Sequence, residues 1–340
     1  MRRRPGAAAR RRLLAHLLVA GGAGYIGSHT LRALRRAGHT AVVVDDLRAG
    51  REAATMGAPL VVCDVGDPIE VPRLLARYGP FDGVLHFAAS IQVAESVARP
   101  LAYYQNNVAA AMNLIDAALP HGVRAFVLSS TAAVYGHPDQ QPIPEDAGIA
   151  PINPYGASKA MTEQILADSE SAHGLRWAAL RYFNACGADP EGGLGECHDP
   201  ETHLIPVALE AAAGLRPALK LFGTDYPTPD GTCVRDYIHV SDLAVAHVSA
   251  VEGLLAGKPG GPYNLGSGVG HSNREVLDAV GRVVGLPVPL EDAPRRPGDP
   301  PTLIADASRF RGDFGWTPRH SDLDTIVATA WEWLRLWRGL

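Results

Sequence analysis

Short apolar runs alternate with segments of helical periodicity in the first half of the chain. The runs are apolar on successive residues, as expected for strands covered on both faces, and they lie at 17–20, 41–45, 60–64, 83–88, 125–130 and 177–184. Helical patterns fill the gaps at 25–37, 69–78, 101–119 and 155–173, the last beginning after Pro154. Strand–helix alternation with right-handed crossovers predicts an α/β fold with a doubly wound parallel sheet of the Rossmann type.

The pattern changes after about residue 185. Gly, Pro and polar residues crowd two stretches, and strand or helix segments reappear at 205–214, 236–253, 273–284 and 323–337. The last helix carries Val327, Trp331 and Leu334 at core spacing, which predicts packing. We therefore expect a dinucleotide-binding domain over 15–185, rejoined by about 233–255, and a smaller C-terminal substrate-binding lobe over 186–340.

The N-terminus is rich in arginine and contains no acidic residue, somewhat like a signal or transit peptide. However, the apolar run that follows is needed as the first strand, no small-residue cleavage site intervenes, and no stretch is long enough to span a membrane. We expect residues 1–14 to be a disordered extension. The alternative is that residues 1–12 are upstream sequence that was included because the start codon was misplaced.

Composition narrows the class of protein. The chain has 340 residues, of which 46% are hydrophobic and 20% charged, and its net charge of -5 gives no reason to expect nucleic-acid or membrane binding. Its four scattered cysteines favour reduced thiols in the cytoplasm. Cys186, Cys197, His198 and His203 lie close together but match no common zinc spacing, so we predict no metal site.

A glycine-rich turn directly follows the first expected strand. Gly21, Gly24 and Gly27 let the backbone approach a pyrophosphate, and the helix that follows supplies N–H donors. Asp45 ends the second strand, where its carboxylate accepts bonds from a ribose 2′-OH and repels a 2′-phosphate. The pattern therefore predicts NAD binding in preference to NADP. Asp64 at the end of the third strand either faces the adenine or caps a helix.

Tyr155 and Lys159 lie about one helical turn apart, so both project from one helix face. A nearby ammonium favours the phenolate form and brings a tyrosine into the range of a general base. By itself the pair also fits an ordinary amphipathic helix. Beside a dinucleotide turn it predicts proton transfer coupled to redox chemistry.

With the hydroxyl-bearing strand end 129–131, these features resemble the extended short-chain dehydrogenase/reductase family. The segments GGAGYIGSHT, HFAASIQVAESV, SSTAAVYG, PYGASK, LRYFNACGA and FGTDYPTPDGTCVRDYIHV further resemble the UDP-glucose 4-epimerases within it. The similarity covers nearly the whole chain from about Leu17. Two positions depart from a common pattern of the family: Gln92 stands where many members have Lys, and His203 stands where some have Asn.

The resemblance implies roles for individual residues. Tyr155 is the expected acid and base, assisted by Lys159 and Thr131. The expected cofactor contacts are Gly21, Gly24, Tyr25, Ile26, Gly27, Asp45, Asp46, Asp64, Val65, Phe87, Ala88, Ala89, Asn106, Lys159 and Tyr182. The expected UDP-sugar contacts are Thr131, Tyr155, Asn184, His203, Leu204, Arg235, Tyr237, Arg296, Asp299 and Leu303.

The implied reaction is the interconversion of UDP-glucose and UDP-galactose through a 4-keto sugar, with tightly bound NAD. Related sugar dehydratases need an acid beside Thr131, where this chain has Ala132 and Ala133. A non-catalytic NAD-binding redox sensor of the same fold typically lacks the Tyr or the Lys, and both are present. Leu303 replaces a Tyr that restricts members to unmodified hexoses, which favours UDP-N-acetylglucosamine as a further substrate. The family also implies a homodimer through the helices at 101–119 and 155–173.

Overall fold

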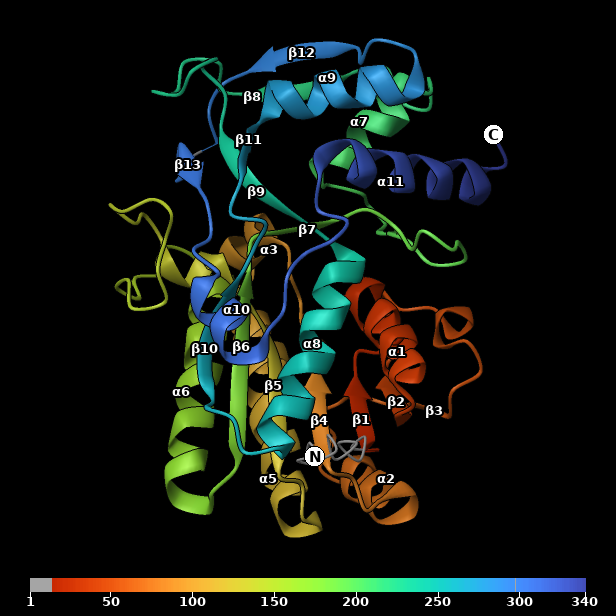
Figure 1. Ribbon diagram of the computed structural model, residues 1–340, viewed down its shortest axis with the longest axis vertical. Helices are drawn as coiled ribbons and strands as arrows, with labels where there is room; N and C mark the ends of the chain where they lie inside the picture. The colour runs from red at the N-terminus through yellow and green to blue at the C-terminus, as the bar shows by residue number, and fades with distance from the viewer. Residues whose placement is uncertain (1–13, 297) are drawn as a thin grey trace, which may run out of the picture.

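The computed structural model describes residues 14–296 and 298–340, so all but the last residue of the expected N-terminal extension lies outside the described residues. A seven-stranded sheet with the order β10-β6-β5-β4-β1-β2-β3 forms the centre of the molecule, and all its strand pairs are parallel (Figure 1). Its strands are β1 (His16–Ala20), β2 (Thr40–Asp45), β3 (Leu60–Val62), β4 (Gly83–His86), β5 (Ala125–Thr131), β6 (Arg176–Tyr182) and β10 (Gly261–Leu265). The predicted doubly wound parallel sheet is confirmed.

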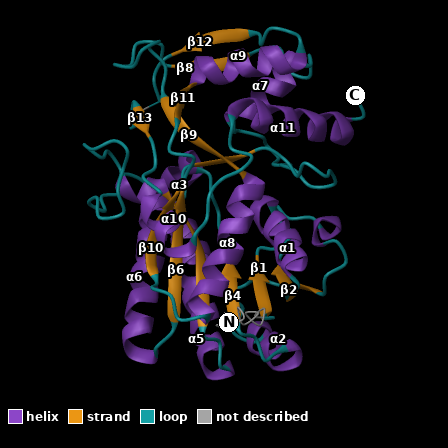
Figure 2. Cartoon of the chain, viewed as in Figure 1, coloured by secondary structure: helices purple, strands orange, loops and turns teal. Residues whose placement is uncertain are grey.

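Helices cover both faces of this sheet (Figure 2). Leu17 and Val19 belong to one apolar cluster with side chains of α1 (Tyr25–Ala37) and α8 (Val240–Leu255). Leu18 belongs to a second cluster on the opposite face, whose helices are α2 (Glu70–Tyr78), α5 (Ala110–Ala118) and α6 (Pro154–His173). Successive residues of one strand therefore enter different cores, which is why the strands are apolar throughout.

The second half of the chain builds a smaller cluster of elements beyond the carboxyl edge of the sheet (Figure 1). Helices α7 (Leu204–Ala212), α9 (Asn273–Val284) and α11 (Leu323–Arg338) share an apolar core. Val327 and Leu334 are buried in it and Trp331 packs against it, as predicted. The short strands are β7 (Asn184–Cys186), β8 (Leu219–Phe222), β9 (Val234–His239), β11 (Gly270–Ser272), β12 (Leu290–Ala293) and β13 (Thr302–Leu303).

Several elements were not predicted from the sequence. Strand β10 completes the large sheet beside β6, and the expected helix at 101–119 is built from α4 (Pro100–Tyr103), the π-helical segment η2 (Tyr104–Ala109) and α5. The remaining elements are η1 (Glu52–Thr55), α3 (Val93–Ala98), η3 (Leu119–His121), η4 (Ala132–Tyr135) and α10 (Ser308–Phe314).

None of the helices in the described ranges combines the length and the apolar character that crossing a bilayer requires.

Neutral histidines in the core predict a loss of stability in mild acid. Burial lowers the pKa of His86 to about 3, with a further contribution from Lys159, and lowers the pKa of His29 and of His247 to about 4. Because these folded-state values lie below the unfolded value of 6.5, the unfolded chain binds more protons between about pH 4 and about pH 6.5. We expect the free energy of unfolding to fall by about 1.4 kcal/mol per histidine for each pH unit below 6.5.

Urea unfolding at several pH values between about 5 and about 6.5 measures this loss. His86→Leu should reduce the slope of stability against pH, since one of the buried histidines whose pKa is lowered (His29, His86, His239 and His247) is removed. His173→Gln, which changes an exposed histidine, is the matched control and should leave the slope unchanged. Equal stability across this pH range in the unmodified protein would contradict the expectation.

Candidate active site

The glycine turn lies between β1 and α1, at the carboxyl edge of the sheet. Gly21 has a φ of 79°, and a Cβ there would lie 2.5 Å from the backbone nitrogen of Ala88. A Cβ on Gly27 would lie 2.2 Å from the carbonyl oxygen of Gly21. At Gly24, the N-cap of α1, a Cβ would meet nothing closer than that oxygen at 3.4 Å. The turn is thus tightly packed from within, while the helix N-terminus stays accessible to a pyrophosphate, so these residues fit a dinucleotide.

Asp45 lies at the carboxyl end of β2, beside this turn. One carboxylate oxygen accepts the N–H of Ala23 at 3.0 Å and the other accepts that of Leu47 at 2.9 Å. Burial raises the pKa of Asp45, and these two backbone hydrogen bonds oppose the rise. Asp45 therefore fixes the turn as well as standing where a ribose is expected.

Other predicted cofactor residues lie along the same edge. Asp46 forms an ion pair with Arg48, whose guanidinium also donates to Asn106 Oδ1 at 2.9 Å. Phe87 and Ala88 follow β4 and donate their N–H groups to the carbonyl of Ala20, with Ala89 next in the chain. The segment from β4 and the π-helical segment that carries Asn106 are therefore both linked to the edge formed by β1 and β2.

Three predicted cofactor residues have structural partners of their own. Asp64 Oδ1 accepts the N–H of Gly66 at 2.8 Å in the turn after β3, whereas Asp67 accepts the N–H groups at the start of α2; Asp64 therefore does not cap that helix, and its adenine contact stays a prediction. Val65 is buried in the sheet core. Tyr25, beside Ile26 at the start of α1, donates its hydroxyl to the carbonyl of Gly187 at 2.6 Å. Tyr25 therefore ties the glycine turn to the loop that leaves β7.

Tyr155 and Thr131 come from the start of α6 and the end of β5. Asn153 caps α6 by accepting the N–H of Gly156 at 2.8 Å, and Pro154 occupies its first turn as predicted. Burial raises the pKa of Tyr155, whereas a hydrogen bond with Thr131 lowers it. Thr131 Oγ1 also accepts the N–H of Ala133 at 3.1 Å, so its position is fixed by the turn that follows β5.

Lys159 lies one turn farther along α6 and is 3% exposed. Its ammonium donates to the carbonyl oxygen of Ser129 at 2.7 Å. Burial lowers the pKa of Lys159 to about 8, and the Glu163 carboxylate opposes that shift. Ser129 in turn bonds the hydroxyl of Tyr182, so the lysine, β5 and β6 form one connected unit. The expected effect of Lys159 on the pKa of Tyr155 stays a prediction.

A buried ion pair behind Lys159 was not predicted from the sequence. Arg181 Nε donates to both carboxylate oxygens of Glu163, at 3.0 Å and 3.1 Å, and Ser130 donates to the same carboxylate. Arg181 also donates to the hydroxyl of Tyr135 at 2.9 Å. This network joins α6 to β5 and β6 directly beneath Tyr155 and Lys159. The sequence did contain one signal for Glu163: it lies four residues beyond Lys159, so both side chains project from the same face of α6.

Four of the ten predicted substrate residues lie on the small sheet. In it, β7 and β13 both pair with β9, which places Asn184 opposite Tyr237 and Leu303 opposite Arg235. Arg235 forms an ion pair with Asp299, and Asn184 Nδ2 donates to the carbonyl of Asp236 at 3.0 Å.

Three further predicted substrate residues lie at the ends of neighbouring segments. The exposed Arg296 stacks over Phe222, with 4.2 Å between the guanidinium carbon and the ring centroid. Leu204 begins α7 and packs against the apolar core that α7, α9 and α11 share. His203 caps that helix and bonds Glu196.

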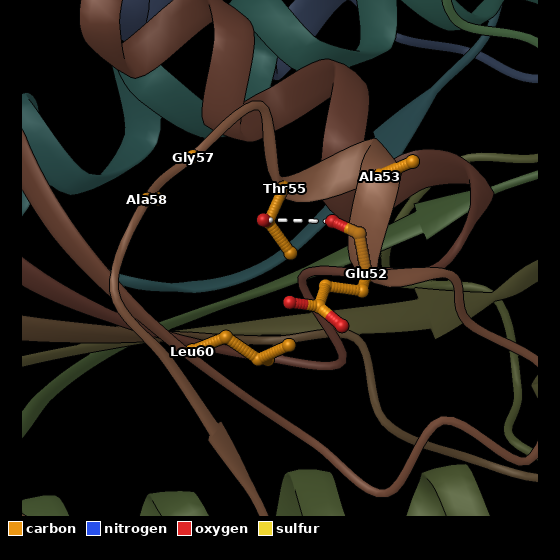
Figure 3. A pocket seen from close by; sticks show the side chains of 6 residues that line it. All are labelled: Glu52, Ala53, Thr55, Gly57, Ala58 and Leu60. Atoms are coloured by element: carbon orange, nitrogen blue, oxygen red, sulfur yellow. Dashed lines mark hydrogen bonds between the residues drawn. The ribbon is translucent and has the colours of Figure 1, made fainter.

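An open hollow of about 620 Å³ lies elsewhere, between η1 and the start of β3 (Figure 3). It is lined by Glu52, Ala53, Thr55, Gly57, Ala58 and Leu60. None of these residues belongs to the predicted site. The chemically competent groups therefore lie at the carboxyl edge of the sheet and not in this hollow.

Comparison with known proteins agrees with this geometry. Residues 17–266 match the model of the NAD dependent epimerase/dehydratase family. The UDP-glucose 4-epimerase of Azospirillum brasilense is 55% identical over 94% of this chain and 92% of its own length. The UDP-glucose 4-epimerase of Brucella ovis in complex with NAD is 48% identical, with a TM-score of 0.91 over 94% of this chain and 98% of that one.

The UDP-Glc/GlcNAc 4-epimerase of Campylobacter jejuni is also similar, at 42% identity and a TM-score of 0.84 over 95% of this chain and 99% of that one. These matches run through both the dinucleotide turn and the Tyr–Lys helix. The match to the family model, together with the identity, length and fold shared with these relatives, places the chain in the NAD dependent epimerase/dehydratase family.

Proposed function

We propose that this protein interconverts UDP-glucose and UDP-galactose by oxidising and reducing C4 of the sugar, with NAD as its resident cofactor. The observation that carries the proposal is the set formed by Thr131, Tyr155 and Lys159 at the edge that also bears the glycine turn. The 55% identical relative from Azospirillum brasilense is a UDP-glucose 4-epimerase, which supports the same activity here.

The protein's own residues have two tasks in this reaction. Tyr155 takes the proton of the sugar 4-OH and later returns it, while Thr131 holds the phenol in place. NAD supplies the hydride acceptor and donor when bound. The cationic Arg235 and Arg296 hold the diphosphate, and Asn184, His203, Leu204, Tyr237 and Asp299 complete the UDP-sugar site. The 4-keto hexose then turns about its diphosphate link, so that its opposite face receives the hydride.

Two other functions fit the fold less well. A sugar dehydratase needs an acid next to Thr131, but the following residues are Ala132 and Ala133. A non-catalytic NAD-binding sensor has no use for a tyrosine hydrogen-bonded to Thr131 beside a buried lysine. Catalysis at C4 uses all three groups.

Purified protein supplied with UDP-galactose and coupled to UDP-glucose dehydrogenase tests the proposal. We expect NADH to form without any added oxidant in the epimerisation step. The assay must include a blank without this protein and a separate arm that measures dehydrated products. No NADH above the blank would refute the epimerase, whereas a dehydrated 4-keto sugar as the final product would support the dehydratase.

Asp45 predicts the choice between NAD and NADP. Asp45→Asn retains one oxygen to accept a backbone N–H of the glycine turn but removes the negative charge that repels a 2′-phosphate. We expect the ratio of NAD to NADP affinity to fall by about tenfold or more. Calorimetric titration of the two cofactors measures it, with Asp278→Asn, an exposed acid on α9, as the control. An unchanged ratio would contradict the assignment.

We also propose that two chains pair through the helical face formed by α3, α4, α5 and α6. Val97, Leu101, Met112 and Met161 are large apolar side chains on these helices, and they are 47% to 75% exposed. Burying them against a second copy would remove this surface from water. We expect light scattering to give twice the chain mass, and Leu101→Glu combined with Met161→Glu to give single chains. A single-chain mass for the unmodified protein would refute the pairing.

We propose the cytoplasm as the compartment. Cys63, Cys186, Cys197 and Cys233 are all free thiols in the structure. Reduced cysteines are typical of proteins that work in a reducing compartment.

A further inference from the structure

Four side chains of one short loop point their polar atoms at a common centre. Glu196, His198, Glu201 and His203 lie between β7 and α7, and one ligand atom from each lies within 4.8 Å of all the others. In the sequence the two histidines group with Cys186 and Cys197, and that spacing predicted no metal site. The structure leaves Cys186 out of this group, because its thiol donates to the carbonyl of Ile238.

The distances suit a small metal ion. Both histidines present Nδ1, with His198 2.9 Å from Glu196 Oε1 and 3.9 Å from Glu201 Oε2. His203 Nδ1 also contacts Glu196 and lies 3.9 Å from Glu201 Oε1. Ligands of a tetrahedral ion with bonds of about 2.1 Å stand about 3.4 Å apart, so Glu196 would move slightly away from both histidines and Glu201 slightly toward them to hold the ion.

The charge of the cluster favours a divalent cation. The side chains of Glu196 and Glu201 are only 6% and 8% exposed. Across the described ranges, neither carboxylate forms an ion pair with a Lys or Arg. With both imidazoles neutral, as metal ligands must be, the cluster carries a charge of minus two, which one divalent ion neutralises. Without the ion, the two histidines are the ion-pair partners of these carboxylates in the described ranges.

The surrounding backbone holds the ligands in place. Glu201 Oε1 accepts the N–H groups of Thr202 at 2.7 Å and His203 at 2.9 Å. Trp333 Nε1 on α11 donates to the carbonyl of Glu196 at 2.8 Å. Such hydrogen bonds around the ligands orient them for a metal.

We propose that Glu196, His198, Glu201 and His203 bind one divalent transition-metal ion, for which Zn²⁺ is the best match. Two imidazoles with two carboxylates form a set of four ligands that is typical of zinc. The ion joins the loop that begins at Gly187 to the glycine turn, because the His198 ring meets the Tyr25 ring edge-on at 6.3 Å and Tyr25 bonds Gly187. The role of the ion is structural; His203 would face the ion through Nδ1 and the proposed UDP-sugar site through its other ring nitrogen, so the ion would also fix one wall of that site.

Metal analysis of untagged, purified protein is the first test. We expect about one Zn²⁺ per chain, or binding of one Co²⁺ per chain with the visible absorption of a tetrahedral site after chelator treatment. Zn²⁺ added to the chelator-treated protein at about 100 times its dissociation constant should raise the melting temperature by about 4 °C. Protein that contains no metal and binds neither Zn²⁺ nor Co²⁺ would overturn the proposal and leave a protonated histidine as the partner of Glu196.

Variants locate the ion. His198→Gln combined with His203→Gln should abolish Co²⁺ binding, and Glu196→Gln should weaken it at least tenfold. His121→Gln combined with His173→Gln removes two histidines outside the cluster and should retain full binding. Circular dichroism confirms that each variant is folded, and His203→Gln alone replaces the double variant if that one does not fold. Equal Co²⁺ binding in the cluster variants and the control would overturn the site. None of these readouts requires epimerase activity.

Discussion

Tyr155→Phe is expected to lower kcat by at least ~10²–10⁴-fold with little change in affinity for the UDP-sugar, since a general acid–base group contributes that much. The substitution keeps the ring and removes only the hydroxyl that hydrogen-bonds with Thr131. Steady-state assays with UDP-galactose, combined with direct measurement of UDP-sugar binding, separate the two effects. Tyr78→Phe at the end of α2 is the matched control.

The pH profile tests the same assignment in a second way. The phenolate is the base, so the rate should rise with pH through the pKa of Tyr155. Because the hydrogen bond with Thr131 lowers that pKa, Thr131→Val should move the rise to higher pH. If Tyr155→Phe retained near-normal kcat, the base would have to be another group.

The strands, turn and helix that carry the candidate site were predicted correctly because they depend on local sequence. The apolar run of β5 ends at Thr131. Asn153 and Pro154 begin α6 directly before Tyr155. The glycine spacing likewise follows from the close approach of Ala88 and Gly21, which any side chain would prevent. Such signals lie within a few residues of the groups that they position.

Other features depend on contacts between distant segments, which spacing does not encode. The Glu163–Arg181 pair forms only because β6 lies beside β5 beneath α6, and neither residue has a local signal for its partner. Strand β10 contains Pro262, and its apolar residues Tyr263 and Leu265 are separated by Asn264, so it has no continuous apolar run. It nevertheless pairs with β6 at the sheet edge. The four-residue cluster beside α7 uses carboxylates in place of the two cysteines, so it matches no cysteine–histidine pattern.

Leu303 gives the prediction with the largest effect on substrate choice. It is half-buried in β13, opposite Arg235, and it packs against the cluster that contains Ala132 and Val134, next to Thr131. A leucine lacks the outer ring atoms and the hydroxyl of a tyrosine, which leaves more room in the sugar site. We therefore expect the protein also to epimerise UDP-N-acetylglucosamine.

Leu303→Tyr should lower kcat/KM for UDP-N-acetylglucosamine by about 10–200-fold while changing that for UDP-glucose much less, because a steric contact of this size decides only a few kcal/mol. Leu290→Tyr places the same change on another short strand, β12, and should alter neither value. Melting temperatures of all variants are needed, since the larger ring also strains its packing. Equal N-acetyl activity before and after Leu303→Tyr would show that Leu303 does not gate the sugar site. Loss of both activities to the same extent would instead mean that its packing against the cluster beside Thr131 supports the catalytic groups themselves.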